Sequence, residues 1–75
     1  MRAVQILTYG KKIIESQSYL IIKYSFKNNT YGSRHYLFKK VGLKTICCRL
    51  LNTKSLEQYF KICQIENERF RNKNN

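Results

Sequence analysis

The segment Ser18–Phe26, which reads Ser-Tyr-Leu-Ile-Ile-Lys-Tyr-Ser-Phe, constrains the fold more than any other part of the chain. From position 20 on, every even-numbered side chain is apolar or aromatic, whereas Lys23 and Ser25 interrupt the odd-numbered set. This alternation, with β-branched and aromatic residues and no glycine or proline, is typical of a half-buried β-strand. The polar run at 27–32 then favours a turn. The pattern predicts a central strand near residues 18–27.

Three further runs of β-forming residues surround this segment. Val4–Tyr9 is stopped by Gly10, and the short connection 11–17 would allow an antiparallel hairpin with the central strand, although Ile13 and Ile14 within it can extend either strand. Two more runs, near 36–41 and 45–50, are separated by Gly42. We therefore predict strands near 3–9, 18–27, 36–41 and 45–50 in one small sheet, mainly antiparallel or mixed.

After the last of these runs the hydrophobic period changes from two to that of a helix. Apolar side chains recur at i, i+3, i+4 and i+7, namely at Leu56, Tyr59, Phe60 and Cys63. Asn52 or Thr53 is a suitable N-cap. This spacing predicts a helix near 53–63 that lies across the sheet.

A second helical turn, at 66–71, is expected to place Phe70 on the core. The fold class that results is α+β, a sheet of about four strands with a C-terminal helix packed on it. A chain of 75 residues has room for one domain, which we place at 1–71, followed by a frayed tail at 72–75.

The charge of the chain points to a polyanionic partner. The chain contains fifteen Lys and Arg residues and only four acidic residues, which gives a formal net charge of +11. Residues 1–50 hold ten of the basic groups and a single acid, Glu15. Tyrosines lie between these charges and can stack on bases or ribose as well as pack in a core. The first two-thirds of the chain is therefore the candidate surface for binding nucleic acid.

Eight residues are the candidate contacts with RNA, because their basic or aromatic side chains fall at predicted turns and strand ends. They are Lys11, Lys12, Lys27, Arg34, Lys39, Lys40, Tyr31 and Tyr36. We expect the six basic groups to reach phosphates, and Tyr31 or Tyr36 to lie against a ribose or base.

Other function classes have little support in the sequence. Four carboxylates, the single His35 and the lack of a glycine-rich phosphate loop make an enzyme, a cofactor or a small-molecule substrate unexpected. The three cysteines, Cys47, Cys48 and Cys63, have no metal-ligand spacing, so we expect neither metal nor disulfide. No apolar run approaches the ~20 residues of a membrane span, so we expect no membrane partner, and we expect no homo-oligomer.

The order of motifs along the chain resembles the bacterial-type small-subunit ribosomal protein S-sixteen family. That family opens with an apolar–polar–apolar strand, then a Gly and a Lys, and continues with a Tyr, an apolar pair, a Gly, a Val-Gly pair and an apolar–aromatic stretch. The matching positions are Val4, Gln5, Ile6, Gly10, Lys12, Tyr19, Ile21, Ile22, Gly32, Val41, Gly42, Leu51, Asn52, Leu56, Tyr59, Phe60, Glu68, Arg69 and Phe70.

This resemblance implies a structural constituent of the small ribosomal subunit. The family binds the 5′ domain of small-subunit rRNA beside neighbouring ribosomal proteins and helps that domain to assemble. Departures from the family pattern, including Ser25 in place of an Asp and a missing Pro after Gly42, suggest a divergent organellar member, in the mitochondrion or alternatively in a plastid.

Two alternatives remain open at this stage. A shorter stretch is similar to ribosomal protein S-fourteen of the same subunit, at Gly32, His35, Lys39, Lys40, Gly42, Leu43, Ile46 and Arg49. The other alternative is a free-standing nucleic-acid-binding regulator of the phage type, in which charge and aromatic content would look the same.

Overall fold

The computed structural model describes residues 3–25 and 32–73, apart from the side chains of 33, 46–48, 72 and 73. A first helix, α1 (Ala3–Tyr9), precedes the strands β1 (Lys11–Glu15), β2 (Tyr19–Ser25), β3 (Ser33–Val41) and β4 (Lys44–Leu51), and a long helix, α2 (Thr53–Lys73), follows them. The four strands form one sheet in the order β1-β2-β3-β4, and each neighbouring pair is antiparallel. The predicted α+β class is confirmed.

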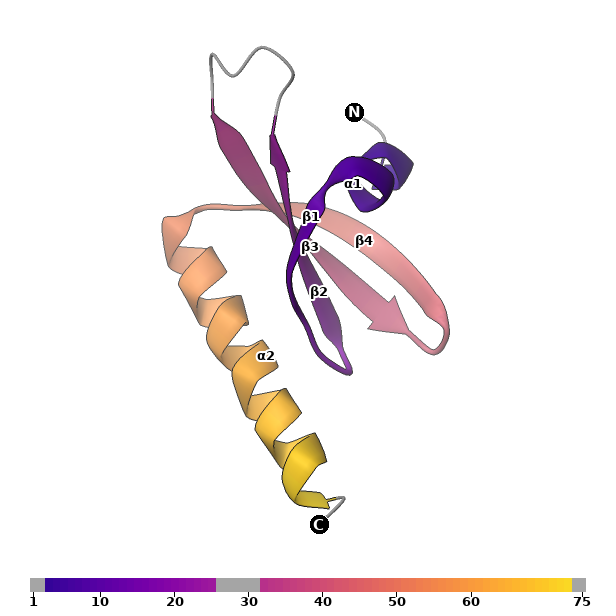
Figure 1. Ribbon diagram of the computed structural model, residues 1–75, viewed down its shortest axis with the longest axis vertical. Coiled ribbons are helices and arrows are strands. Elements are labelled where there is room, and N and C mark those ends of the chain that lie inside the picture. Colours follow the sequence, from indigo (N-terminus) through magenta and orange to yellow (C-terminus); the bar gives the residue numbers. More distant parts are fainter. Residues whose placement is uncertain (1–2, 26–31, 74–75) are drawn as a thin grey trace.

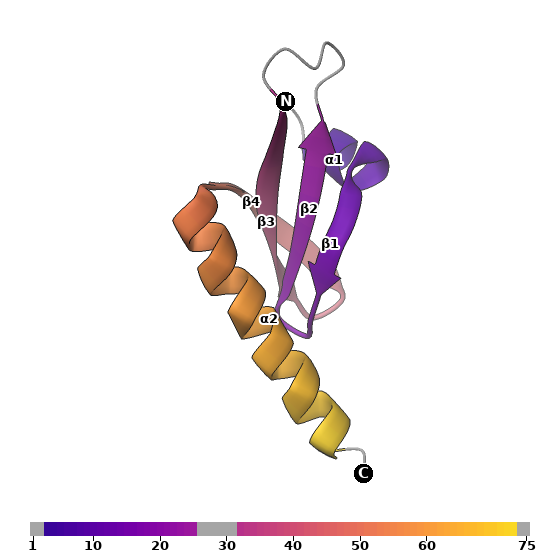
Figure 2. The same ribbon diagram turned by 60° about the vertical axis from the view of Figure 1, so that its left-hand side comes forward.

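The sheet is the middle layer of the molecule, with one helix on each face (Figures 1 and 2). Residues that are paired across strands share a face, and successive residues of a strand alternate between faces. On the α1 face, Leu20 pairs with Phe38, and both pack with Ile6 of α1. On the α2 face, Ile21 pairs with Leu37, and both pack with Cys63 of α2. The central strand is therefore buried on both faces, and not on one face only as a half-buried strand would be.

The predicted first strand at residues 3–9 is wrong, because this segment is α1. Ile6 is 2% exposed and fills a site above Ile22 and Phe38, and the amide of Gly10 closes the helix by donating to the Ile6 carbonyl at 2.9 Å. Burial of that one side chain outweighs the β preference of the local sequence. The first strand is instead Lys11–Glu15, the segment that we expected to be a connection.

Gly10 permits this close approach of α1 to the sheet. A Cβ at this position would lie 2.2 Å from Cγ2 of Ile22 and 2.5 Å from the Ile6 carbonyl oxygen. No larger residue fits between the end of α1 and β2 without displacing one of them. The position of α1 therefore depends on this glycine.

The predicted C-terminal helix is confirmed at its start and along its apolar stripe. The Oδ1 of Asn52 accepts a hydrogen bond from the Ser55 amide at 2.8 Å, and the Ser55 hydroxyl accepts one from the Asn52 amide at 3.1 Å, so Asn52 is the N-cap. The stripe side chains at 56, 59, 60 and 63 pack on the α2 face of the sheet. Tyr59 meets Tyr19 edge to face, with ring centroids 5.3 Å apart.

The C-terminal end of α2 differs from the prediction. There is no separate helical turn, because α2 continues without a break to Lys73, into the tail that we expected to fray. Its last turns extend beyond the sheet (Figures 1 and 2), and Phe70 is 62% exposed. The expectation that Phe70 packs on the core is therefore wrong, since no strand lies beneath this part of the helix.

Candidate nucleic-acid interface

The cross-strand register brings basic side chains together at one end of the sheet. We call the end that carries residues 16–18 and 42–43 the hairpin end, and the end at which β1 begins and β4 finishes the open end. At the open end Lys11, Lys23, His35 and Leu51 are cross-strand partners at one level, one from each strand. Leu51 is buried in the cluster that packs against α2. Lys11, Lys23 and His35 lie on the same face, one level beyond Ile21 and Leu37. Two lysines and a histidine therefore form a transverse row on this face.

At the hairpin end, the acidic side chain of Glu15 binds two lysines. Glu15 accepts a hydrogen bond from Lys12 at 3.0 Å and another from Lys40, and these two contacts are the ion pairs found within residues 3–25 and 32–73. The hydrogen bond from Lys40, then the one from Lys12, hold the pKa of Glu15 below its usual value. Glu15 thus neutralises Lys12 and Lys40, whereas Lys39 and Lys44 at the hairpin end and Lys11 and Lys23 at the open end have no ion pair among the described residues.

His35 differs from an ordinary surface histidine. Its side chain is half-buried, and burial, followed by the positive charge of Lys23, lowers its pKa below the usual 6.5. Both effects oppose a further positive charge at this level of the sheet. The lowered pKa favours the neutral imidazole, which carries one N–H donor, next to Lys23.

The eight residues predicted to contact RNA do not form one surface. Lys11 and Lys39 are exposed on the α2 face, at opposite ends of the sheet, whereas Lys12, Arg34, Tyr36 and Lys40 belong to the α1 face. Lys12 and Lys40 bind Glu15, the single acid of residues 1–50, so these two basic groups already have an acidic partner. Lys27 and Tyr31 lie outside the described residues.

The first core cluster, on the α1 face, consists of Ile6, Leu20, Ile22 and Phe38. Tyr36 and Tyr24 are half-buried against it, so packing occupies at least part of each ring. Sequence reasoning missed Lys23 and considered His35 only for catalysis or metal binding. The available signal was that Lys23 is the single charge inside the central strand.

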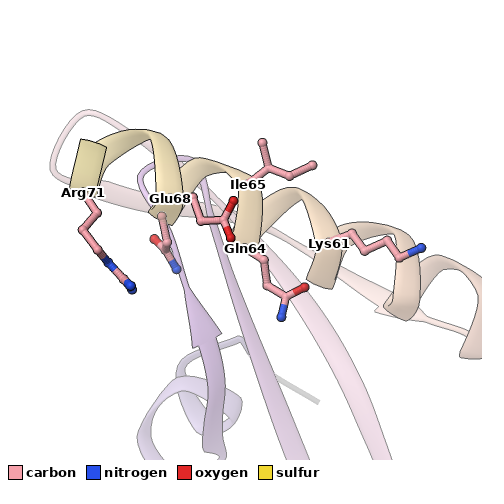
Figure 3. Close-up of a pocket in the computed structure, with 6 residues that line it drawn as sticks. Lys61, Gln64, Ile65, Glu68 and Arg71 are labelled. Atoms are coloured by element: carbon pink, nitrogen blue, oxygen red, sulfur yellow. The ribbon is translucent and has the colours of Figure 1, made fainter. Parts of the chain in front are cut away.

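The hollows of the surface are shallow. The hollow shown in Figure 3, about 480 Å³, is lined by α2 alone, and its charged members Lys61, Glu68 and Arg71 do not converge on one point. A second depression, of about 730 Å³, lies where β4 passes into α2, and His35, Arg34, Thr53 and Leu56 are among its lining residues. This second depression adjoins the open-end row.

The described side chains form no cluster of metal ligands. Apart from Cys47 and Cys48, whose side chains lie outside the described part of the structure, no three side chains of the His, Cys, Asp and Glu types within 3–25 and 32–73 come together in a way that would hold a metal ion. Neither helix combines the length and the apolar character that a membrane crossing requires, again for the described part of the chain. Cys63 is a buried thiol, and burial raises its pKa.

Comparison of the chain with protein-family models, with curated proteins and with solved structures finds no match.

Proposed function

We propose that this protein is a non-enzymatic RNA-binding protein that acts as a structural constituent of the small ribosomal subunit. The observation that carries the proposal is the pairing of two like charges, Lys11 and Lys23, on neighbouring strands of one face. The ion pairs of the described residues involve only Lys12 and Lys40, so Lys11 and Lys23 are left uncompensated in a chain of net charge +11. An uncompensated cationic surface on a small rigid fold suits the phosphate backbone of a nucleic acid.

The more specific assignment to the S-sixteen family, with binding to the 5′ domain of the rRNA in an organelle, is part of the same proposal. Its support is the order of motifs from Tyr19 to Phe60, which lie on β2, β3, β4 and α2. The opening block, Val4 to Ile6, gives no support, because the family begins with a strand and this chain begins with α1. The S-fourteen assignment is not favoured by the fold, since residues 11–25 are strands in place of that family's N-terminal helices.

Co-sedimentation tests this function. Ribosomal particles from cells that express the tagged full chain are washed in high salt and separated by sedimentation, and the small-subunit fraction is analysed by mass spectrometry. A structural subunit protein stays with the small subunit. A free-standing regulator is released by the wash, and that result would contradict the proposal.

A further inference from the structure

We infer that the open-end row, Lys11, Lys23 and His35, is the place where the protein binds the phosphodiester backbone of RNA. The inference rests on the proposed function. It places RNA binding on one surface, the open end of the α2 face, beyond Ile21 and Leu37.

The first support is a repulsive pair that the fold retains. Lys11 and Lys23 are direct cross-strand partners on the same face, an arrangement of like charges that destabilises a sheet. Lys11 is exposed and Lys23 half-buried, so Lys23 is held in place by its surroundings. The ion pairs of the described residues involve Glu15 at the other end of the sheet and do not offset this repulsion. Backbone phosphates of an RNA strand, one at each ammonium group, would offset the repulsion through two charge-assisted hydrogen bonds.

The second support is the setting of His35, the next residue in the row. Lys23 faces it from β2, and the side chains from β4 and α2 that line the same depression are Leu50, Leu51, Asn52, Thr53 and Leu56, none of them charged. On its own strand, the adjacent Arg34 is paired with Tyr24 and also lines this depression, so it adds positive charge there. The first turn of α2 contains no acid.

The described residues around His35 therefore supply positive charge and no negative charge. A bound phosphate would supply the negative charge and favour protonation of the imidazole. RNA binding at this row is then coupled to uptake of a proton by His35.

The row also has the extent that an extended backbone requires. Adjacent strands lie roughly 4.8 Å apart, so Lys11 and His35 are separated by roughly 10 Å across the sheet. Phosphate contacts of this kind fix orientation and do not read sequence. We therefore expect binding to depend on salt and weakly on base sequence.

The salt dependence of binding tests the row. The probe is a fluorescein-labelled RNA hairpin of about 20 nucleotides, and affinity is measured by fluorescence anisotropy over a range of KCl concentrations. Each lost phosphate contact flattens the slope of log K against log salt by about 0.7–0.9, so Lys11→Gln with Lys23→Gln is expected to flatten it by about 1.4–1.8. The matched control, Lys44→Gln with Lys61→Gln, removes the same charge from the start of β4 and from an exposed position of α2, and is expected to leave the slope unchanged. Circular dichroism checks that each variant is folded.

The pH dependence of the same binding tests the histidine. Affinity of the unaltered protein for the hairpin is expected to rise as the pH falls from 7.5 to 5.5, and this rise is expected to disappear in His35→Gln. If the affinity of both proteins rises equally as the pH falls, His35 is not part of the RNA-binding site.

The outcomes separate this inference from the function on which it rests. If the unaltered protein binds the hairpin and the Lys11/Lys23 variant keeps its slope, the row is wrong while RNA binding stands. If the unaltered protein shows no salt-dependent binding to RNA, or binds only duplex DNA of the same length, the proposed function fails and the inference fails with it.

Discussion

The Glu66 carboxylate on α2 accepts a hydrogen bond from the Ser16 hydroxyl at 2.5 Å, across fifty positions of the sequence. The same carboxylate accepts bonds from the Ser18 hydroxyl at 2.6 Å and from the Ser18 amide at 3.3 Å. Ser16 is only 5% exposed, and its amide donates to the Tyr19 carbonyl. One acidic side chain thus fastens α2 to the turn between β1 and β2, near the lower end of the sheet in Figure 2.

This contact makes the stability of the fold depend on pH. Burial alone would raise the pKa of Glu66, but the hydrogen bonds from Ser16 and Ser18 and the charge of Arg69 outweigh it, so the pKa is lowered from 4.5. A group whose pKa is lower in the folded state contributes stability above its unfolded pKa and loses it as the pH falls through the folded value. We therefore expect the free energy of unfolding to fall below about pH 4.5, as Glu66 and Glu15, whose pKa is also lowered, take up protons.

The variant Glu66→Gln should be less stable than the unaltered protein at pH 7, and should lose less stability between pH 5 and pH 3. Urea unfolding at several pH values measures this difference. Glu68→Gln is the matched control, since Glu68 is an exposed glutamate on the same helix. Parallel acid curves for Glu66→Gln and the unaltered protein would show that the carboxylate does not hold the turn.

Phe38 and Phe70 allow the same substitution at two contrasting sites. Phe38 is 1% exposed in the first core cluster, whereas Phe70 is 62% exposed near the end of α2. Truncation of a buried aromatic costs about 3–5 kcal/mol, so Phe38→Ala should unfold much of a domain this small. Phe70→Ala should change the free energy of unfolding by less than about 0.5 kcal/mol. Similar losses for both would contradict the burial described above.

Phe60 lies between these two cases. Its ring is half-buried against the cluster of Ile21, Leu37, Leu51 and Cys63 on the α2 face. Phe60→Ala is therefore expected to cost less than Phe38→Ala, because truncation removes less buried surface. Chemical denaturation of the two variants side by side measures the difference.

Lys11→Glu separates stability from binding. It replaces a like-charge cross-strand pair with an opposite-charge pair against Lys23, which should stabilise the sheet by about 0.2–1 kcal/mol. The same change places a negative charge on the proposed RNA surface, so affinity for the RNA hairpin should fall. Thermal unfolding and anisotropy measure the two effects. If Lys11→Glu is less stable than the unaltered protein, the Lys11–Lys23 pairing is contradicted. If it binds the RNA hairpin with unchanged affinity, the proposed binding surface is contradicted.

Lys12 and Lys40 should contribute less to RNA binding than their charges suggest, because Glu15 already binds both. Lys12→Gln with Lys40→Gln is expected to flatten the salt slope by less than about 0.7, the value for one phosphate contact. It also removes both partners of Glu15, so the acid-induced loss of stability should become smaller. If this pair of substitutions flattens the slope as much as Lys11→Gln with Lys23→Gln, the RNA surface includes the α1 face.

The parts of the fold that follow from local pattern could be predicted from the sequence. The alternation in β2, the apolar stripe of α2 and the Asn52 cap each depend on residues a few positions apart, so their periods are visible in the chain itself. The C-terminal end of α2 was not predictable in this way. Phe70 continues an apolar–basic pattern, but the sheet ends before it, and no local signal records where a sheet ends.

The sequence by itself determined that this is a basic α+β domain with an alternating central strand and a capped C-terminal helix, whereas burial of that strand on both faces came only with the tertiary structure. Only the tertiary structure decided the state of residues 3–9, because a seven-residue apolar segment suits a helix or a strand, and burial of Ile6 against Ile22 and Phe38 selects the helix. The tertiary structure also decided which cations act together. Lys11 and Lys12 are adjacent in the chain yet lie on opposite faces of β1, so one joins Lys23 while the other joins Glu15. Cross-strand register sets these partners, and register is a property of the assembled sheet.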